Sequence, residues 1–305
     1  MNKVGYIYDD VFLLHEPPAG HPDSPDRLQS INSSLKAVDL WGRLAHLKPR
    51  KALPEDLALA HTPEAIERIR SMGAGEVDPD TYASVESFNA ASYAAGAVME
   101  AVEQCRSNGM RRVFCAVRPP GHHAEADSAM GFCLFNNVAV GARHAQRIGY
   151  NKVFIIDFDA HHGNGTQHIF EEDDTVFYFS THQHPYYPET GKDMERGRGK
   201  GEGFTYNVPI LAGSGNKDYL AVYQDILPGV VQRFGPDIIL VSAGYDIHAN
   251  DPHANIRVTH EGIHGIVRSI LTSAEVPMVF VLEGGYDLPS LCDSVKITIE
   301  EMLRS

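Results

Sequence analysis

Short apolar runs without polar interruptions alternate with longer amphipathic stretches along most of this chain. Unbroken apolar runs are typical of strands buried on both faces of a parallel sheet, whereas the amphipathic stretches keep the spacing of surface helices. The alternation predicts an α/β fold in which a central, mainly parallel sheet is covered by helices on both faces. The apolar runs lie at residues 113–117, 153–156, 176–179, 238–241 and 278–282.

The amphipathic stretches predict helices over residues 86–106, 135–149, 217–234 and 288–303. The first 80 residues, with a proline-rich stretch from Pro17 to Pro25, are interpreted as helices and loops around the rim of the sheet. No linker-like segment interrupts the chain, so we expect one domain over residues 1–305.

Composition limits the class of protein further. The formal net charge of −14 argues against a nucleic-acid partner, and it reflects either solubility or a preference for a cationic substrate. No apolar run approaches the roughly 18 residues of a membrane span, and the N-terminus lacks the pattern of a secretory signal. The 4 cysteines show no CxxC spacing, which indicates buried thiols in a reducing compartment. We therefore expect a cytoplasmic protein without a membrane partner, and the oligomeric state stays open.

Polar clusters follow four of the five apolar runs, at the points where the predicted strands end. In α/β proteins, ligands bind beyond the carboxyl ends of the strands. We therefore expect the four clusters to converge on one pocket. They are residues 118–123 (RPPGHH), 157–163 (DFDAHHG), 242–246 (SAGYD) and 283–286 (EGGY).

Three residues of these clusters form a candidate metal site. Asp159 and His161 are two residues apart on an extended segment, so their side chains project to the same side, and Asp246 supplies a third ligand. Three protein ligands with an open position are typical of catalytic zinc, and two oxygen ligands would also suit iron(II) or cobalt(II). Any one of these residues alone would be explained more simply as a hydrogen-bonded core residue or a capped turn.

The same clusters supply groups for proton transfer. His122 and His123 are candidates for a general base, because the pKa of histidine lies near neutrality. Asp157 could orient one imidazole and Asn164 the other. Tyr286 follows two glycines, and its hydroxyl could stabilise an oxyanion.

A competing motif lies further along the chain. The segment from His260 to His264 matches the HExxH motif of zinc metallopeptidases, with Glu283 as a possible third ligand. In those peptidases the third ligand lies on a helix, whereas Glu283 ends a predicted strand, so the motif is interpreted as surface histidines of a helix. Two further histidines, His182 and His184, are expected to be solvated loop residues, and the glycine-rich residues 197–203 a mobile surface loop.

Five segments together resemble the zinc-dependent histone deacetylase family, most closely its class II branch. That branch includes bacterial histone-deacetylase-like amidohydrolases and acetylpolyamine amidohydrolases. The resemblance runs from about Ser24 to the C-terminus, and it implies the arginase/deacetylase fold. The segments are RPPGHHA, GFCLFNNVAVGARHAQ, DFDAHHGNGTQ, SAGYD and EGGY.

The resemblance implies a zinc-dependent amidohydrolase that removes the acetyl group from acetylated lysine or a related acetylated amine. Zinc would be held by Asp159, His161 and Asp246. His123 would be the general base and then the acid that protonates the leaving amine. Tyr286 would bind the substrate carbonyl.

The resemblance also implies a charged pair and a second ion. His122, paired with Asp157, would stay mostly charged and help to orient water. A structural potassium ion would be bound by Asp157, Ser180 and Thr181, together with backbone oxygens of Asp159 and His161.

The substrate tunnel is implied by a third set of positions. Phe132 and Tyr187 match residues that flank the acyl-lysine tunnel, and Gly131 lies beside them. Asp80 aligns with the rim residue that anchors the substrate backbone. His253 stands at the rim where a polyamine-selective relative has glutamate, so acetyl-lysine in peptides is favoured over acetylpolyamines.

Two further positions bear on activity. Asn164 is the residue found in class II, where class I enzymes carry aspartate. Tyr286 is retained, unlike in the low-activity class IIa enzymes, which favours a true enzyme over a non-catalytic acyl-lysine binder. The chain is shorter than most bacterial relatives, so the depth of the tunnel stays open.

Overall fold

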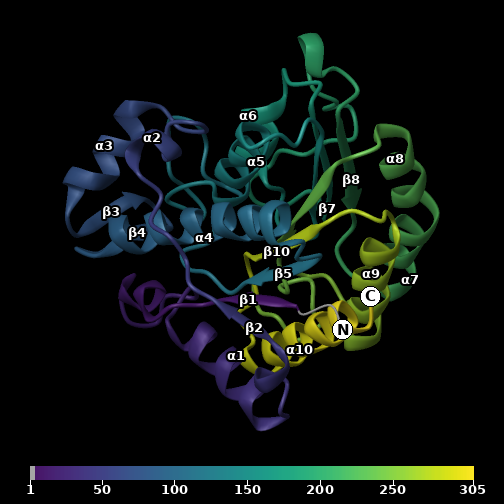
Figure 1. Cartoon of the computed structure of the whole chain (residues 1–305), viewed down its shortest axis with the longest axis horizontal. Coiled ribbons are helices and arrows are strands. Elements are labelled where there is room, and N and C mark those ends of the chain that lie inside the picture. Colours follow the sequence, from purple (N-terminus) through teal and green to yellow (C-terminus); the bar gives the residue numbers. More distant parts are fainter. Residues whose placement is uncertain (1–3) are drawn as a thin grey trace.

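A sheet of eight parallel strands runs through the protein, within the residues 4–305 that the structure, a computed structural model, describes (Figure 1). Its strands are β1 (Gly5–Ile7), β2 (Ala45–Leu47), β5 (Arg112–Cys115), β6 (Val153–Asp157), β7 (Val176–Gln183), β8 (Thr205–Ile210), β9 (Ile238–Ala243) and β10 (Met278–Leu282). Their order across the sheet is β2-β1-β5-β10-β9-β6-β7-β8. Every neighbouring pair is parallel. A short antiparallel hairpin of β3 (Gly75–Asp78) and β4 (Thr81–Ala83) lies outside this sheet.

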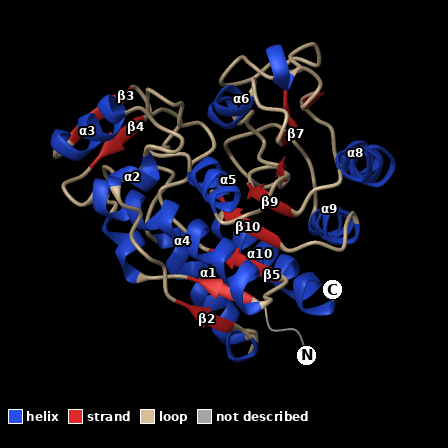
Figure 2. Ribbon diagram, turned by 45° about the horizontal axis from the view of Figure 1, so that its top comes forward, coloured by secondary structure: helices blue, strands red, loops and turns tan. Residues whose placement is uncertain are grey.

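Helices cover both faces of the sheet. The α-helices are α1 (Asp26–Ala37), α2 (Pro54–Leu57), α3 (Pro63–Met72), α4 (Ser87–Asn108), α5 (Asn137–Arg147), α6 (Asn164–Phe170), α7 (Asn216–Ala221), α8 (Leu227–Phe234), α9 (His260–Thr272) and α10 (Leu288–Arg304). Helices α4 and α5 pack together on one face, whereas α10 packs against α1 and α9 on the other (Figures 1 and 2).

The predicted fold class is confirmed. Strands β5, β6, β9 and β10 are buried at every position, as their unbroken apolar sequences indicated. The predicted helix over residues 217–234 consists of α7, a π-helical turn (Val222–Ile226) and α8. All four cysteines are buried and free.

Two expectations about the sheet were wrong. The first 80 residues do not only pack around its rim, because β1 and β2 belong to the sheet and extend it beyond β5. Strand β8, which forms the opposite edge, was not expected, because its sequence TYNVPI lacks an unbroken apolar run. Short or edge strands bury few residues and therefore leave a weak sequence pattern.

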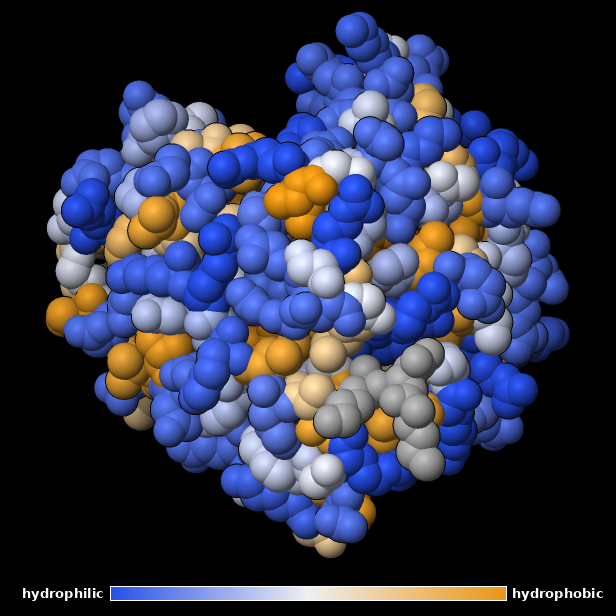
Figure 3. Space-filling model, in the orientation of Figure 1, coloured by the Kyte–Doolittle hydropathy of each residue, from blue (hydrophilic) through white to orange (hydrophobic). Residues whose placement is uncertain are grey.

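The surface carries no broad apolar area in the view of Figure 3, which is mostly hydrophilic with small, separate hydrophobic spots. Among residues 4–305, no helix is long and apolar enough to cross a membrane.

A buried histidine, His61, ties the N-terminal part of the chain to the start of helix α5. The Nδ1 atom of His61 lies 2.9 Å from the carbonyl oxygen of Glu125, and its Nε2 atom accepts a hydrogen bond from the backbone amide of Asn136 at 2.8 Å. Asn136 is the N-cap of α5. The two contacts require a neutral ring, and burial lowers the pKa of His61 to about 4.

We expect this histidine to make the protein sensitive to acid. In the unfolded chain, His61 becomes protonated as the pH falls below about 6.5, whereas in the folded protein it stays neutral until about pH 4. The free energy of unfolding therefore decreases between these two pH values. From pH 7.5 to 4.5, His61 should lower the free energy of unfolding by roughly 2–3 kcal/mol. Urea unfolding of the wild type and His61→Gln measures this, because glutamine offers a donor and an acceptor without titrating. An equal decrease in the free energy of unfolding of both proteins would show that His61 is not the group responsible.

Candidate active site

The four predicted polar clusters follow strands that are direct neighbours in the sheet. Strands β5, β10, β9 and β6 lie side by side in this order, so their carboxyl ends form one continuous edge. The cluster after each strand therefore meets the other three. This edge carries the candidate active site.

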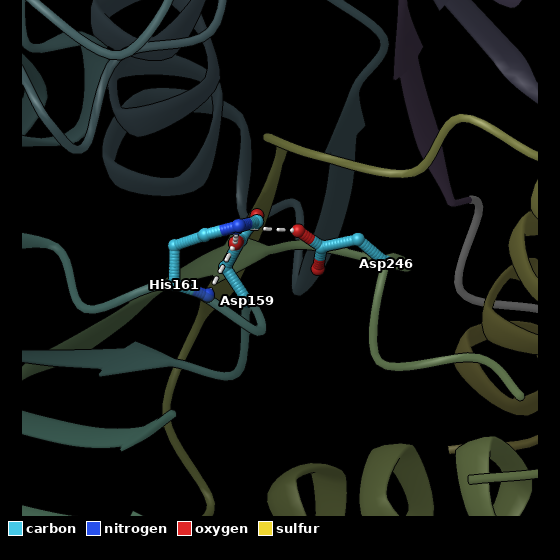
Figure 4. Close-up of side chains that lie close together, drawn as sticks. All are labelled: Asp159, His161 and Asp246. Carbon is cyan, nitrogen blue, oxygen red and sulfur yellow. Dashed lines mark hydrogen bonds and ion pairs between the residues drawn. The ribbon is translucent and has the colours of Figure 1, made fainter. Parts of the chain in front are cut away.

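The candidate metal ligands lie together at this edge (Figure 4). The Nδ1 atom of His161 is 2.8 Å from Oδ2 of Asp246 and 3.1 Å from Oδ1 of Asp159. Both carboxylates are almost fully buried, whereas His161 is partly accessible. Within residues 4–305, these three are the only group of three or more histidine, cysteine or acidic side chains with metal-binding spacing.

The donor set fits a metal cation. Two buried carboxylates face each other, and no lysine or arginine within the described residues forms an ion pair with either of them. Burial and the charge of Asp159 raise the pKa of Asp246 to about 7, so the pair of carboxylates calls for a positive charge. Gly284 leaves the room required, since a Cβ atom there would lie 2.7 Å from Oδ2 of both aspartates.

The two adjacent histidines are held by different partners. The Nδ1 atom of His122 lies 3.0 Å from Oδ2 of Asp157, and Nδ1 of His123 lies 2.8 Å from Oδ1 of Asn164. Burial alone would lower the pKa of His122, but the carboxylates of Asp157 and Asp159 outweigh it and raise the pKa to about 10. Burial and the charge of His122 lower the pKa of His123 well below its usual value. The pair is therefore one charged and one neutral imidazole.

The tautomer of His123 follows from the position of Glu125, a residue that the sequence analysis missed. The Nδ2 atom of Asn164 donates to Oε1 of Glu125 at 2.5 Å, which leaves Oδ1 as the acceptor that faces His123. The Nδ1 atom of His123 therefore carries the proton and donates a hydrogen bond to Oδ1 of Asn164. Its Nε2 atom keeps a lone pair, as a general base requires.

A narrow pocket of about 190 Å³ leads to the candidate metal ligands. It contains ten of the predicted site residues and, in addition, Pro120, Tyr186 and Gly284, which were not predicted. The predicted residues that line it are Asp80, His122, His123, Gly131, Phe132, Asp159, His161, Tyr187, His253 and Tyr286. Three further predicted residues lie outside the lining and contact its histidines: Asp157 contacts His122, Asn164 contacts His123 and Asp246 contacts His161.

Two rim residues are fixed by the surrounding chain. The Oδ1 atom of Asp80, in the turn of the β3–β4 hairpin, accepts hydrogen bonds from the backbone amide of Gly131 (3.0 Å) and the hydroxyl of Thr81 (2.8 Å). His253 packs with its ring centroid 4.6 Å from that of Tyr286. Burial lowers the pKa of His253, so this part of the rim is uncharged near neutral pH.

Tyr286 is oriented by a buried arginine that the sequence analysis missed. Arg27 donates from Nε to the carbonyl oxygen of Gly285 (2.7 Å) and from Nη2 to that of Glu283 (2.5 Å), and its guanidinium lies 5.0 Å from the ring of Tyr286. Asp251 holds the same segment by accepting the backbone amide of Tyr286 at 2.6 Å. Burial raises the pKa of the Tyr286 phenol well above its usual value, so the hydroxyl remains a donor.

Glu283 has a supporting position that the metallopeptidase alternative does not explain. Its Oε2 atom accepts the backbone amides of Gly121 (2.7 Å) and His122 (3.2 Å), and its Oε1 atom accepts the hydroxyl of Ser242 at 2.9 Å. The carboxylate thus joins three strand-end clusters. His260 and His264 lie on α9, as expected, but His264 pairs with Glu301 (3.2 Å) instead of Glu283.

The residues proposed for potassium lie on neighbouring strands. Asp157 at the end of β6 is in register with Ser180 on β7, and Thr181 follows. The Ser180 hydroxyl already pairs with Nδ1 of His182 (2.8 Å), and the Thr181 hydroxyl pairs with Tyr223 (2.9 Å). A potassium ion here would therefore depend on Asp157 and on backbone oxygens.

The expectation for His182 was wrong. It lies in β7 and is fully buried, and its Nε2 atom contacts the carbonyl oxygen of Gly191 at 2.8 Å. His184 is only partly buried. Strand β7 extends to Gln183 because β8 pairs with it along this polar stretch, and that partner was not expected.

Comparisons with known proteins agree with this geometry. The histone deacetylase domain family matches residues 21–302. A probable deacetylase of Methanothermobacter thermautotrophicus is 41% identical over 93% of this chain and 86% of its own length. Histone deacetylase 5 of Arabidopsis thaliana is 39% identical over 99% of this chain, which spans only 49% of that relative. The human polyamine deacetylase HDAC10 is 36% identical over 95% of this chain and 46% of its own length.

A solved structure extends the agreement to three dimensions. The crystal structure of the HDA15 HD domain has a TM-score of 0.95 and 37% sequence identity, and the match covers 99% of this chain and 91% of that one. The chain belongs to the histone deacetylase family, and its interpretation as a deacetylase is confirmed.

Proposed function

We propose that this deacetylase hydrolyses the acetamide of acetyl-lysine side chains in peptides or proteins, with zinc bound by Asp159, His161 and Asp246. One observation carries the proposal. A pocket of about 190 Å³ is lined by Asp159, by His161 and by His123, whose Nε2 atom has a free lone pair. A linear acetylated amine suits this volume better than a bulky ring system, since pockets for drug-sized ligands are about 300 Å³ or larger.

Zinc would polarise the acetamide carbonyl and lower the pKa of a water molecule, and iron(II) or cobalt(II) could do the same with this donor set. The chain supplies the remaining groups. His123 takes the proton of the attacking water on Nε2 and later delivers it to the departing amine. Asn164 accepts a hydrogen bond from Nδ1 of His123, which leaves Nε2 unprotonated before this transfer.

The developing negative charge on the carbonyl oxygen is met by two groups. Tyr286 donates its phenolic proton in a hydrogen bond to this oxygen. His122, charged through Asp157, supplies a positive field beside His123, since the two imidazole centroids are 4.1 Å apart. We also propose that potassium binds to the carboxylate of Asp157 and to backbone oxygens, including those of Ser180 and Thr181, and stabilises the end of β6.

The substrate chain would extend between two aromatic walls. Phe132 and Tyr187 line the pocket, with the ring of Phe132 6.0 Å from Tyr286 and that of Tyr187 5.2 Å from His123. Such walls accept the methylene groups of lysine. At the rim, Asp80 could accept backbone amides of a peptide, and uncharged His253 offers no attraction to a polyamine.

A second candidate is an acetylpolyamine substrate. One relative is named a polyamine deacetylase, and two acidic residues lie in the β3–β4 hairpin, where the carboxylate of Asp78 accepts the backbone amide of Asp80 at 3.1 Å. Two acidic groups near the rim would favour a cationic tail. This candidate competes with the peptide for the same pocket.

A substrate panel distinguishes the two. We expect a higher kcat/KM for acetyl-lysine peptides than for acetylputrescine, acetylcadaverine or acetylspermidine. The matched variant His253→Glu should shift the ratio towards acetylpolyamines by about tenfold, or about 1.4 kcal/mol of transition-state preference, because it adds a charge at the rim. Wild-type turnover of an acetylpolyamine that exceeds peptide turnover tenfold would reverse the assignment.

A further inference from the structure

A second cavity, of about 610 Å³, shares no lining residue with the deacetylase pocket. Its lining residues come mainly from strand β8, helix α8 and the loop of residues 193–204. Strand β8 is the edge strand of the sheet, and α8 lies near it in Figure 1. Its volume is within the range of small-molecule sites. The deacetylase reaction does not use it.

Cations gather in this cavity although the chain is acidic overall. Lys152, Arg196 and Arg233 line it, and Asp193 is the one acidic residue beside them in the described part of the wall. None of the three cations has a carboxylate partner within residues 4–305. Lys152 Nζ donates to the carbonyl oxygen of Phe234 (2.9 Å), and Arg196 Nε donates to that of Asp193 (3.3 Å). In a chain of net charge −14, three such cations around one cavity indicate an anionic ligand.

Aromatic rings form another part of the wall, and Lys152 Nζ lies 5.2 Å from the ring centroid of Phe234. The ring centroid of Phe234 lies 5.5 Å from that of Phe177 and 6.0 Å from that of Phe204, and both contacts are edge-to-face. Tyr206 lines the same cavity and is partly exposed. A wall of this kind suits a flat ring, which can pack on aromatic faces and edges.

A buried amide forms a fixed part of the cavity wall. Asn207 lines the cavity and is only 4% exposed. Its Nδ2 atom donates to Oε1 of Gln167 (2.6 Å) and to the carbonyl oxygen of Glu195 (3.2 Å), which fixes the orientation of the amide. Its Oδ1 atom has no hydrogen-bond partner within the described residues. Because this oxygen is shielded from solvent, it is not open to a molecule in the cavity, and the amide is a rigid part of the wall.

We propose that this cavity binds a nucleoside monophosphate. The phosphate would pair with Lys152, Arg196 and Arg233, and the base would pack against the aromatic wall. One molecule of this class brings both the negative charge that the three cations favour and a flat ring for the aromatic wall.

Calorimetric titration of the metal-loaded enzyme with adenosine 5′-monophosphate tests this. We expect a dissociation constant below about 1 mM, with adenosine and inorganic phosphate each binding more weakly. Arg233→Ala should weaken binding about tenfold or more, because a charge-assisted contact is lost, while deacetylase turnover stays unchanged. The matched control Arg43→Ala removes an equally exposed arginine outside the cavity and should bind as the wild type does.

Three results would overturn the proposal. The first is the absence of binding at millimolar nucleotide. The second is equal affinity in Arg233→Ala and the wild type. The third is competitive inhibition of deacetylation with the same constant, which would place the nucleotide in the deacetylase pocket. A control with 2-naphthoate separates the classes, since binding of this carboxylate without binding of the nucleotide would exclude a nucleotide site.

Discussion

Asp246→Ala is expected to remove both the bound metal and the deacetylase activity. The Oδ2 atom of Asp246 lies 2.8 Å from Nδ1 of His161, so the substitution takes away one of the three proposed ligands. Loss of groups that merely orient a metal ligand costs about 10- to 100-fold, and loss of a ligand should exceed this. The metal content measured by elemental analysis and the turnover of an acetyl-lysine peptide should therefore decrease together. Turnover should decrease by more than about 100-fold.

Two controls make this result specific. Asp246 also accepts the backbone amide of Ala160 at 2.8 Å, so Asp246→Asn, which keeps an acceptor, shows whether the fold survives. The double variant His260→Ala/His264→Ala should keep full metal content and activity, because these histidines lie on α9 away from the ligands. A protein that keeps its metal and turnover after Asp246→Ala would place the metal site elsewhere.

His123→Ala should slow the chemical step by more than about 100-fold without emptying the metal site. The reason is that the general base is lost: the lone pair on Nε2 of His123 accepts the proton of water. Asn164 keeps this lone pair free, because it accepts a hydrogen bond from the protonated Nδ1 atom. Tyr286→Phe should cost a similar factor, about 100-fold or more, because one oxyanion donor is lost. Single-turnover kinetics together with metal analysis measure both effects.

The comparison with His122 decides the roles within the pair. His122→Ala should be less damaging than His123→Ala, because His122 contributes charge and orientation instead of transferring the proton. A larger loss in His122→Ala would reverse the two assignments. Metal loss in His123→Ala would show that the histidine supports the ligands and is not only a base.

The sequence predicted the central strands but not the edges of the sheet. Strands β5, β6, β9 and β10 are buried on both faces, so each position must be apolar and the pattern is visible. Strands β1 and β2 have 3 residues each, and such a short pattern cannot be distinguished from a loop. His182 was misplaced for the same reason, because β7 is extended by pairing with an edge strand.

The candidate site could be located from sequence because its side chains sit next to strong strand patterns. Asp159, Asp246 and Tyr286 are of this kind. Arg27 is not, since it contacts the carbonyl oxygen of Gly285 at a sequence separation of 258 residues and leaves no local motif. Glu283 was visible in the sequence, but its role as an acceptor for the backbone of Gly121 and His122 depends on the assembled sheet.

Reconstitution with metal tests the central claim most directly. Enzyme stripped by a chelator should release less than about 1% of the acetate that the untreated enzyme releases from an acetyl-lysine peptide. One equivalent of zinc per chain should restore turnover, and Asp246→Ala should not respond, because Asp159 and His161 alone cannot hold the ion. Full turnover by the stripped enzyme would contradict metal-dependent hydrolysis at this site.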